Sequence, residues 1–218
     1  MKTHAEHLLN HLLNGGNDST ANELLAEFFD GYPIEKLRLL LESKQETAFK
    51  AGAWIASELG ERVGPLVDEL SRSLEHSSRY VRFFILDAIL SGATNEHGEA
   101  ISRAVLRIQD PDEAIRWKAL RFLAKATQDQ LAAAMPHLGD DSIGKMLVWL
   151  IDSLGTEIRK QDVIGKLSDT DRLVRMFAAA VSARLAPFDI TLLEHAAVST
   201  DTEVSSFAKE ELDALRSH

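Results

Sequence analysis

A short motif recurs along the chain at intervals of roughly thirty residues, and this spacing limits the fold more than any other feature. Each copy has a polar turn, then an aliphatic residue followed by Arg. An apolar residue comes four positions after the aliphatic one, which is the spacing of one face of an α-helix. The clearest copies are HSSRYVRFFILDAIL (76–90), DPDEAIRWKALRFLA (110–124) and DTDRLVRMFAAAVSA (169–183).

Weaker copies extend the series toward both ends of the chain. Counted from the first apolar residue of each motif, at positions 49, 81, 115, 143, 174 and 204, the intervals are 32, 34, 28, 31 and 30 residues. Each interval has room for two helices and two turns, and sustained period-two alternation, the signature of strands, is absent. The sequence therefore predicts a stack of helix pairs.

An Asp five residues before a Val-Arg or Ile-Arg pair resembles the motif of the HEAT-repeat family, a group of armadillo-type α-solenoids. The resemblance covers roughly residues 34–218. It implies an all-α, right-handed α-solenoid of about six HEAT-like helix pairs in a single elongated domain. Only two copies carry Asp at the motif position, where the successive residues are Lys44, His76, Asp110, Leu138, Asp169 and Ser199.

The same resemblance implies that the Asp and Arg side chains bridge neighbouring repeats. A carboxylate in a turn can accept from turn amides, and a planar guanidinium can reach the next turn. We therefore expect a structural ladder that is interrupted where Asp is replaced. Its members are Arg82, Asp110, Arg116, Asp169 and Arg175.

The first 33 residues lie outside the repeat series and predict a helical cap, residues 1–33, before the repeat array, residues 34–218. Residues 3–14 form an amphipathic pattern that ends at two glycines. A second helix follows within residues 17–33, with Asp18, Ser19 or Thr20 as its N-cap. Residues 22–61 are similar to small bacterial HEAT-like proteins, some of which are immunity proteins of toxin systems.

Helical geometry together with the family pattern predicts an inner, concave face at the second, sixth and ninth positions after each motif's first apolar residue. Large aromatic side chains beside charged ones are typical of a protein-binding surface. A shift of this frame by one residue would instead place the aromatic side chains in the core, and the sequence leaves both possibilities open. The predicted face contains Glu58, Phe83, Asp87, Trp117, Arg121, Trp149, Asp152 and Met176.

The charge balance limits the classes of partner. The chain has 24 Lys and Arg against 34 Asp and Glu, a formal net charge of −10. Such a surface repels nucleic-acid phosphates and anionic lipids and favours a basic partner. The longest apolar run, MLVWLI (146–151), is far too short to span a bilayer, and the chain has no cysteine. We expect a cytoplasmic protein.

Signals for catalysis are weak. The chain has no Gly-rich phosphate loop in a strand–loop–helix context and no Gly-x-Ser-x-Gly motif. Asp140 and Asp141 fit a helix cap better than an acid–base pair. His4, His7 and His11 share one helix face and could bind a metal, but a polar stripe on a terminal helix is the favoured interpretation. We therefore predict no enzymatic activity, no cofactor and no metal.

These features predict a non-catalytic protein-interaction module that binds a basic partner protein along its concave face. The resemblance to small bacterial HEAT-like proteins adds a possible role as an immunity or inhibitor protein of a bacterial toxin. The alternative is a HEAT-like DNA-repair enzyme of the glycosylase type, or a lyase-type enzyme, acting through the concave groove. Trp117, Lys118, Arg121 and Trp149 support that alternative, whereas the acidic charge opposes it.

Overall fold

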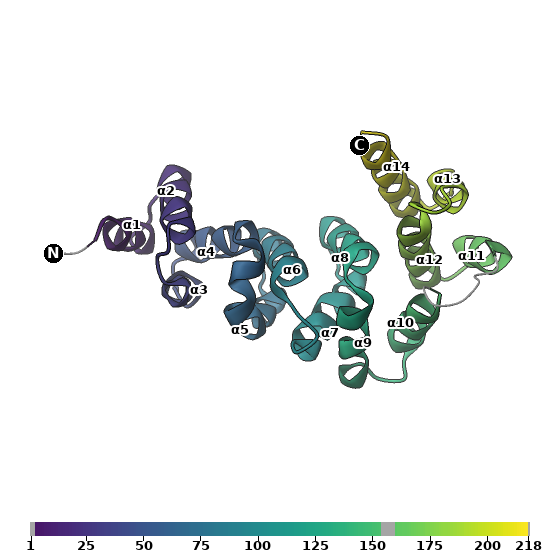
Figure 1. Ribbon diagram of the computed structural model, residues 1–218, viewed down its shortest axis with the longest axis horizontal. Helices are drawn as coiled ribbons and strands as arrows, with labels where there is room; N and C mark the ends of the chain where they lie inside the picture. Colours follow the sequence, from purple (N-terminus) through teal and green to yellow (C-terminus); the bar gives the residue numbers. More distant parts are fainter. Residues whose placement is uncertain (1–2, 154–159, 218) are drawn as a thin grey trace. The chain divides into compact units, whose positions relative to one another are not determined.

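The computed structural model describes residues 3–153 and 160–217, and within these ranges the chain forms fourteen α-helices and no strands (Figure 1). It divides into two compact units, residues 1–94 and 95–218. The first unit contains α1 (His4–Leu13), α2 (Asp18–Phe29), α3 (Arg38–Leu41), α4 (Glu46–Glu58), α5 (Val67–Arg72) and α6 (Arg79–Gly92). The second contains α7 (Gly98–Leu106), α8 (Glu113–Lys125), α9 (Gln128–Ala134), α10 (Ser142–Asp152), α11 (Lys160–Leu167), α12 (Arg172–Leu185), α13 (Thr191–Ala197) and α14 (Thr202–Arg216).

The order of the helices confirms the predicted α-solenoid. From α3 to α14 they form six successive pairs, each with a shorter first helix and a longer second helix that carries the repeat motif. Helices α1 and α2 precede this series, and they pack against α3 and α4. The predicted boundary after residue 33 lies within the first compact unit, and the division between the two units follows α6.

The amino-terminal helices show how short-range signals set the helix ends. Thr3 and Glu6 form a reciprocal capping box at the start of α1, and Gly15 takes a left-handed φ of 94° after its end. Asn17 caps α2, because its side-chain oxygen accepts from the Thr20 amide at 3.1 Å. The predicted N-cap at Asp18, Ser19 or Thr20 is therefore wrong by at least one residue.

Helices α4 and α6 form the centre of the first unit. The buried side of α4 begins at Ala48 and continues through Ala53 and Ile55, and α6 buries Val81 and Ile85 against it. Gly52 lies so close to α3 that a Cβ atom there would be 2.8 Å from the Cβ of Leu40. Burial of each large aliphatic side chain stabilises the fold by about 1.5–3 kcal/mol.

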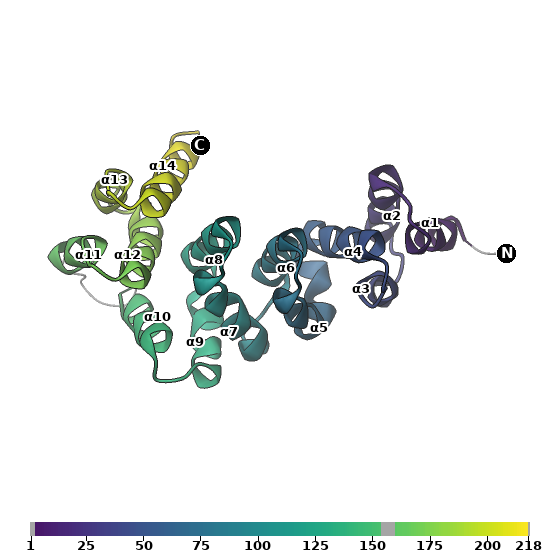
Figure 2. The same ribbon diagram turned by 180° about the vertical axis from the view of Figure 1, so that it is seen from behind.

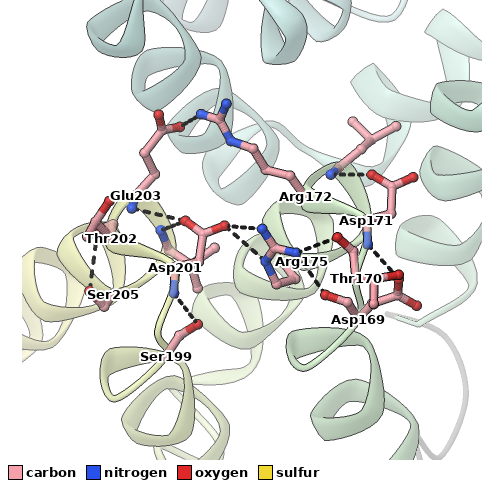
Figure 3. Close-up of polar contacts among 12 residues, drawn as sticks. Asp169, Thr170, Asp171, Arg172, Arg175, Ser199, Asp201, Thr202, Glu203 and Ser205 are labelled. Carbon is pink, nitrogen blue, oxygen red and sulfur yellow. Dashed lines mark hydrogen bonds and ion pairs between the residues drawn. The ribbon is translucent and has the colours of Figure 1, made fainter.

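The repeat arginines bind the turns that precede their own helices. Arg116 donates from Nη1 to the carbonyl oxygens of Asp110 and Pro111, both at 2.8 Å. Arg82 makes the same two bonds to residues 76 and 77, at 2.7 and 3.0 Å, and Arg175 makes them to residues 169 and 170, at 2.8 and 2.9 Å (Figure 3). These charge-assisted bonds satisfy carbonyls in the turn of the arginine's own repeat, whereas the predicted contact was with a neighbouring repeat.

The residue at the predicted Asp position closes the turn, and residues other than Asp can do this. Asp169 accepts from the amide of Asp171 at 2.8 Å, and Asp110 accepts from that of Asp112 at 3.0 Å. The His76 Nδ1 and the Ser199 Oγ accept equivalent bonds at 3.0 and 3.2 Å. The predicted interruption of the turn contact at these two positions is therefore wrong, because imidazole and hydroxyl groups also supply an acceptor.

The fourth pair departs from the regular stack. Gly144 occupies the position at which the three clearest copies of the motif have Arg. A Cβ atom at Gly144 would be only 2.2 Å from the carbonyl oxygen of Gly139. Helix α10 packs against α9 and α12 (Figure 1), whereas α8 packs closely against α12 and α14. The motif helices of the third, fifth and sixth pairs therefore pack together within the second unit.

Polar contacts hold this arrangement. Arg175 donates to Asp201 at 2.6 and 2.9 Å (Figure 3). Glu203 forms ion pairs with both Arg172 and Arg116, and Figure 3 shows the pair with Arg172. The guanidinium of Arg184 donates to the carbonyl oxygens of residues 123 and 126 at the end of α8, at 2.8 and 2.6 Å. The side chains of Glu203 and Asp201 are only 11% and 9% exposed, so the two carboxylates are largely removed from water.

Candidate binding groove

An aromatic groove lies in the first unit, between α2 and the second helices of the first two repeat pairs, α4 and α6. We use this name for two adjoining cavities that share Lys50 and Tyr80 in their linings, with volumes of about 650 and about 490 Å³. The larger cavity lies between α2, α4 and α6. Figure 2 shows α2, α4 and α6 as successive helices. The larger part is lined by Gly16, Asn17, Asp18, Ala21, Asn22, Thr47, Lys50, Ala51, Trp54, Tyr80 and Phe84.

The groove follows from the rotation of α4 and α6 about their axes. Thr47, Lys50 and Trp54 occupy one stripe of α4, at spacings of three and four residues. Tyr80 and Phe84 form the matching stripe on α6. Because the two stripes face the same cavity, three aromatic side chains from two helices line one cavity wall.

On α4, the buried positions begin one residue earlier than the repeat pattern predicts. The buried stripe starts at Ala48, not at Phe49, so Ile55 is fully buried and Trp54 lines the groove. The expectation that residue 55 belongs to an inner face is therefore wrong. A one-residue error in the frame rotates the predicted face by about 100° around the helix. The sequence left such an error open, and it occurs in this repeat. The signal in the sequence that could have indicated the groove is Trp54, which is adjacent to the predicted face position 55.

The two adjacent phenylalanines of α6 differ in their position relative to the groove. Phe84 is half-buried and lines the groove. Phe83 is also half-buried and meets Phe84 edge-to-face, with ring centroids 5.9 Å apart. Glu58 is exposed and Asp87 half-buried on the same two helices, outside the lining of the groove.

The smaller part of the groove, which we call the basic cleft, has a volume of about 490 Å³ and shares Lys50 and Tyr80 with the larger part. The Arg79 guanidinium lies 5.1 Å from the Tyr80 ring centroid and donates to the Tyr80 hydroxyl at 3.4 Å. This hydrogen bond lowers the pKa of the Tyr80 hydroxyl. The basic cleft is lined by Ser43, Lys44, Glu46, Phe49, Lys50, His76, Ser77, Ser78, Arg79 and Tyr80.

In the second unit, the predicted face residues belong to two separate environments. Trp117 on α8 is half-buried, with the Arg121 guanidinium 5.5 Å from its ring centroid. Trp149 on α10 is also half-buried, but its neighbour is Lys166 of α11, at 5.0 Å. Asp152 is exposed at the end of α10. The structure therefore gives each tryptophan a different cationic neighbour on a different helix.

Met176 does not belong to an exposed face. It is 1% exposed in the core of the second unit, so its assignment to the partner-binding surface is wrong. Helix α12 is enclosed because α8, α10, α11, α13 and α14 all pack around it. Lys118, which supported the DNA-repair alternative, is 8% exposed, and Arg121 lies 3.9 Å from Glu210 of α14.

The other chemical groups considered in the sequence are the Asp140-Asp141 pair and the histidines of α1. Asp141 caps α10 by accepting from the Gly144 amide at 3.0 Å, as predicted for the Asp140-Asp141 pair. His11 contacts the Thr20 hydroxyl at 3.1 Å. No group of three His, Asp or Glu side chains in residues 3–153 and 160–217 is placed to hold a metal ion. None of the helices in these ranges is long and apolar enough to cross a membrane.

Comparison with known proteins supports the fold. No protein-family model and no curated protein matches the chain. An engineered protein solved by the Northeast Structural Genomics Consortium is 19% identical, with 99% of this chain and 98% of that chain covered and a TM-score of 0.50. A designed armadillo repeat protein is 18% identical, with 97% and 92% covered and a TM-score of 0.50.

A second engineered protein from the same consortium is 17% identical, with 97% of this chain and 68% of that chain covered and a TM-score of 0.51. Identities this low establish a likeness of fold alone. Together with the six successive helix pairs, the likeness shows that this chain is an α-solenoid of the kind found in a designed armadillo repeat protein.

Proposed function

We propose that this protein is a non-catalytic interaction module that binds a partner protein through the aromatic groove. The observation that carries the proposal is the lining of the groove by Trp54, Tyr80 and Phe84. Tyr80 is 54% exposed, and large aromatic side chains that remain accessible in a concave surface are typical of protein-binding hot spots. A groove of this kind accepts side chains of a partner more readily than it encloses a small substrate.

The finer predictions about the partner rest on the sequence. The net charge of −10 supports a basic partner for the surface as a whole, and the resemblance to small bacterial HEAT-like proteins supports a cytoplasmic toxin inhibitor. Both stay predictions. The acidic excess is spread along the chain, since residues 1–94 contain nine Lys and Arg against fourteen Asp and Glu.

The surroundings of the cationic residues favour a non-catalytic interaction module over a DNA-repair enzyme. Lys118 is buried and Arg121 lies beside a carboxylate, so neither is well placed to neutralise a phosphate. Of the two tryptophans cited for that alternative, Trp117 lies beside Arg121 of its own helix, whereas Trp149 lies beside Lys166 of α11.

Affinity capture from the native host tests the proposal. The wild-type protein is compared with Tyr80→Ala/Phe84→Ala, which removes two of the three aromatic side chains of the groove, and with Trp149→Ala, which alters a half-buried tryptophan of the second unit. We expect at least one protein to be captured by the wild type and by Trp149→Ala but not by the groove variant. Equal capture of every protein by all three would contradict the proposal, and a salt-sensitive mobility shift of a DNA duplex would favour the alternative.

A further inference from the structure

The aromatic groove has an uneven distribution of charge. The basic cleft at one end is lined by three cationic side chains, Lys44, Lys50 and Arg79, and by one carboxylate, that of Glu46. The Glu46 carboxylate lies 2.6 Å from the Lys50 ammonium, so the charges of these two side chains are paired. Counted over all its lining side chains, the cleft has more cations than carboxylates, in a unit where acidic residues outnumber basic ones.

Two backbone features add to this local potential. Helix α4 begins at Glu46 and helix α6 begins at Arg79, and the first residues of both helices line the basic cleft. Neither helix has a side chain that caps its N-terminus. The amino ends of helices carry partial positive charge, which favours a nearby anion.

The other end of the groove has a different character. Trp54 and Phe84 provide apolar surface there, and the Asp18 carboxylate lies among the lining residues of α2. Lys50 and Tyr80 stand where the two parts meet, since they line both. An extended ligand would therefore meet cations at one end and aromatic rings followed by a carboxylate at the other.

From this arrangement we infer that the groove binds an acidic peptide segment of the partner protein, in which Asp or Glu side chains flank an aromatic or aliphatic anchor. The anchor packs against Trp54 and Phe84, and the carboxylates lie in the basic cleft near Lys50 and Arg79. Charge complementarity orients the peptide, because Asp18 repels carboxylates from the far end of the groove. This local preference is opposite to the one that the net charge of the whole chain predicts.

A peptide fits these features better than a nucleic acid. Three cationic side chains could neutralise only a few phosphates, and the acidic remainder of the unit would repel the rest of a nucleic-acid strand. A peptide needs only one or two carboxylates for the basic cleft, and it supplies the apolar anchor that the aromatic rings require.

The experiment is a selection of binders from a displayed library of random short peptides, using the full-length wild-type protein as the target. Enriched peptides are then synthesised, and their affinity is measured for the wild type and for Lys44→Gln/Lys50→Gln/Arg79→Gln. We expect enrichment of Asp and Glu beside an aromatic or aliphatic residue. The triple substitution should weaken binding by about tenfold or more, since each exposed charge pair contributes a factor of a few. Added salt should weaken binding to the wild type in the same direction.

Matched controls separate local charge from net charge. Lys36→Gln/Lys209→Gln removes two exposed cations outside the groove and should leave the affinity unchanged. Tyr80→Ala should abolish binding of the same peptides, and its circular dichroism melting curve shows whether it folds. Because Tyr80 is 54% exposed, we expect the variant to melt close to the wild type.

This inference rests on the proposed function, but the two fail in different ways. Enriched peptides that lose binding in Tyr80→Ala but are basic or neutral would overturn the acidic preference and leave the groove as the binding surface. Peptides that bind Tyr80→Ala as well as the wild type, or a library with no enriched binder, would overturn both. Displacement of the peptide by a short DNA duplex would identify phosphate as the preferred anion and would also overturn the inference.

Discussion

Arg116 on α8 donates from Nε to an oxygen of Glu203 on α14 at 3.2 Å, although 87 positions separate the two residues in the sequence. The family resemblance leads us to expect such an arginine to reach the next repeat. Arg116 belongs to the third pair but contacts the sixth. The reason is that α8 packs against α12 and α14, whereas α10, the motif helix of the fourth pair, packs against α9 and α12. The side chains of Arg116 and Glu203 are 13% and 11% exposed. This contact therefore joins distant parts of the second unit away from water.

Substitution of Arg116 should lower the stability of the protein. Arg116→Ala leaves the buried Glu203 carboxylate with Arg172 as its remaining ion-pair partner and leaves two turn carbonyls without their donor. We expect the free energy of unfolding to fall by about 2–4 kcal/mol, measured by urea denaturation. Arg103→Ala is the control, because it removes an exposed pair with Glu99 and should cost less than about 0.5 kcal/mol. Equal losses would contradict a special role for the buried pair.

Acid should weaken the same region. Burial alone would raise the pKa of Glu203, but hydrogen bonds from Arg116 and Arg172 outweigh burial and lower it below 4.5. Burial opposes the bonds from Arg175 to Asp201 in the same way, and the pKa of Asp201 falls below 3.8. A carboxyl with a lowered folded-state pKa stabilises the fold above its unfolded-state pKa and loses that contribution as the pH falls through the folded-state value.

We therefore expect the free energy of unfolding to decline as the pH falls below about 4.5, the unfolded-state value for Glu203. Urea denaturation at a series of pH values measures this decline. In Glu203→Gln the decline should be shallower, because one of the two carboxyls with a lowered pKa no longer titrates. A variant whose stability declined as steeply as that of the wild type would show that Glu203 does not contribute.

Met176 and Trp149 offer a test of the corrected binding face. Met176→Ala removes a fully buried side chain and should lower the free energy of unfolding by about 2–4 kcal/mol. Trp149→Ala removes a half-buried side chain beside Lys166 and should cost less, because part of the ring is already in contact with water. Thermal melting curves of the two variants give the order, and a smaller effect at Met176 would contradict its place in the core.

Two glycines in the second unit should respond in opposite directions to the same substitution. A Cβ atom at Gly98 would be 2.2 Å from the Ala133 carbonyl oxygen, so Gly98→Ala must shift the backbone between α7 and α9. We expect a loss of about 1–3 kcal/mol. Gly165 lies within α11 with nothing inside 4 Å of that position, so Gly165→Ala should stabilise the protein by about 0.5–1 kcal/mol. Circular dichroism melting of both variants measures the difference, and a stabilised Gly98→Ala would contradict the close approach.

Much of the fold could be predicted because its signals are local. The spacing of the motif gives the number of helix pairs, and the cap at Asp141 lies within a few residues of the amide that it binds. Arg82, Arg116 and Arg175 bind carbonyls five and six residues earlier, so a repeated sequence reproduces the same turn. Contacts of this range depend on the segment alone.

The candidate site was harder to predict because it depends on the rotation of whole helices. Trp54 lines the groove and Ile55 is buried, although they are neighbours in the sequence. The hydrophobic pattern of α4 tolerates either choice, since Ala48 and Phe49 could each start the buried stripe. Packing against α3 and α6 selects Ala48, because Gly52 must meet Leu40 closely.

The sequence by itself determined that the chain forms helix pairs at a regular interval and that an arginine recurs at the same position of three of them. The tertiary structure decided which helices are neighbours and which side of each helix faces outward. It placed α12 between α8 and α14 and enclosed Met176, and it brought Trp54, Tyr80 and Phe84 to one cavity. The physical reason is that helix formation needs only local periodicity, whereas the rotation and position of each helix minimise exposed apolar surface over all of its neighbours at once.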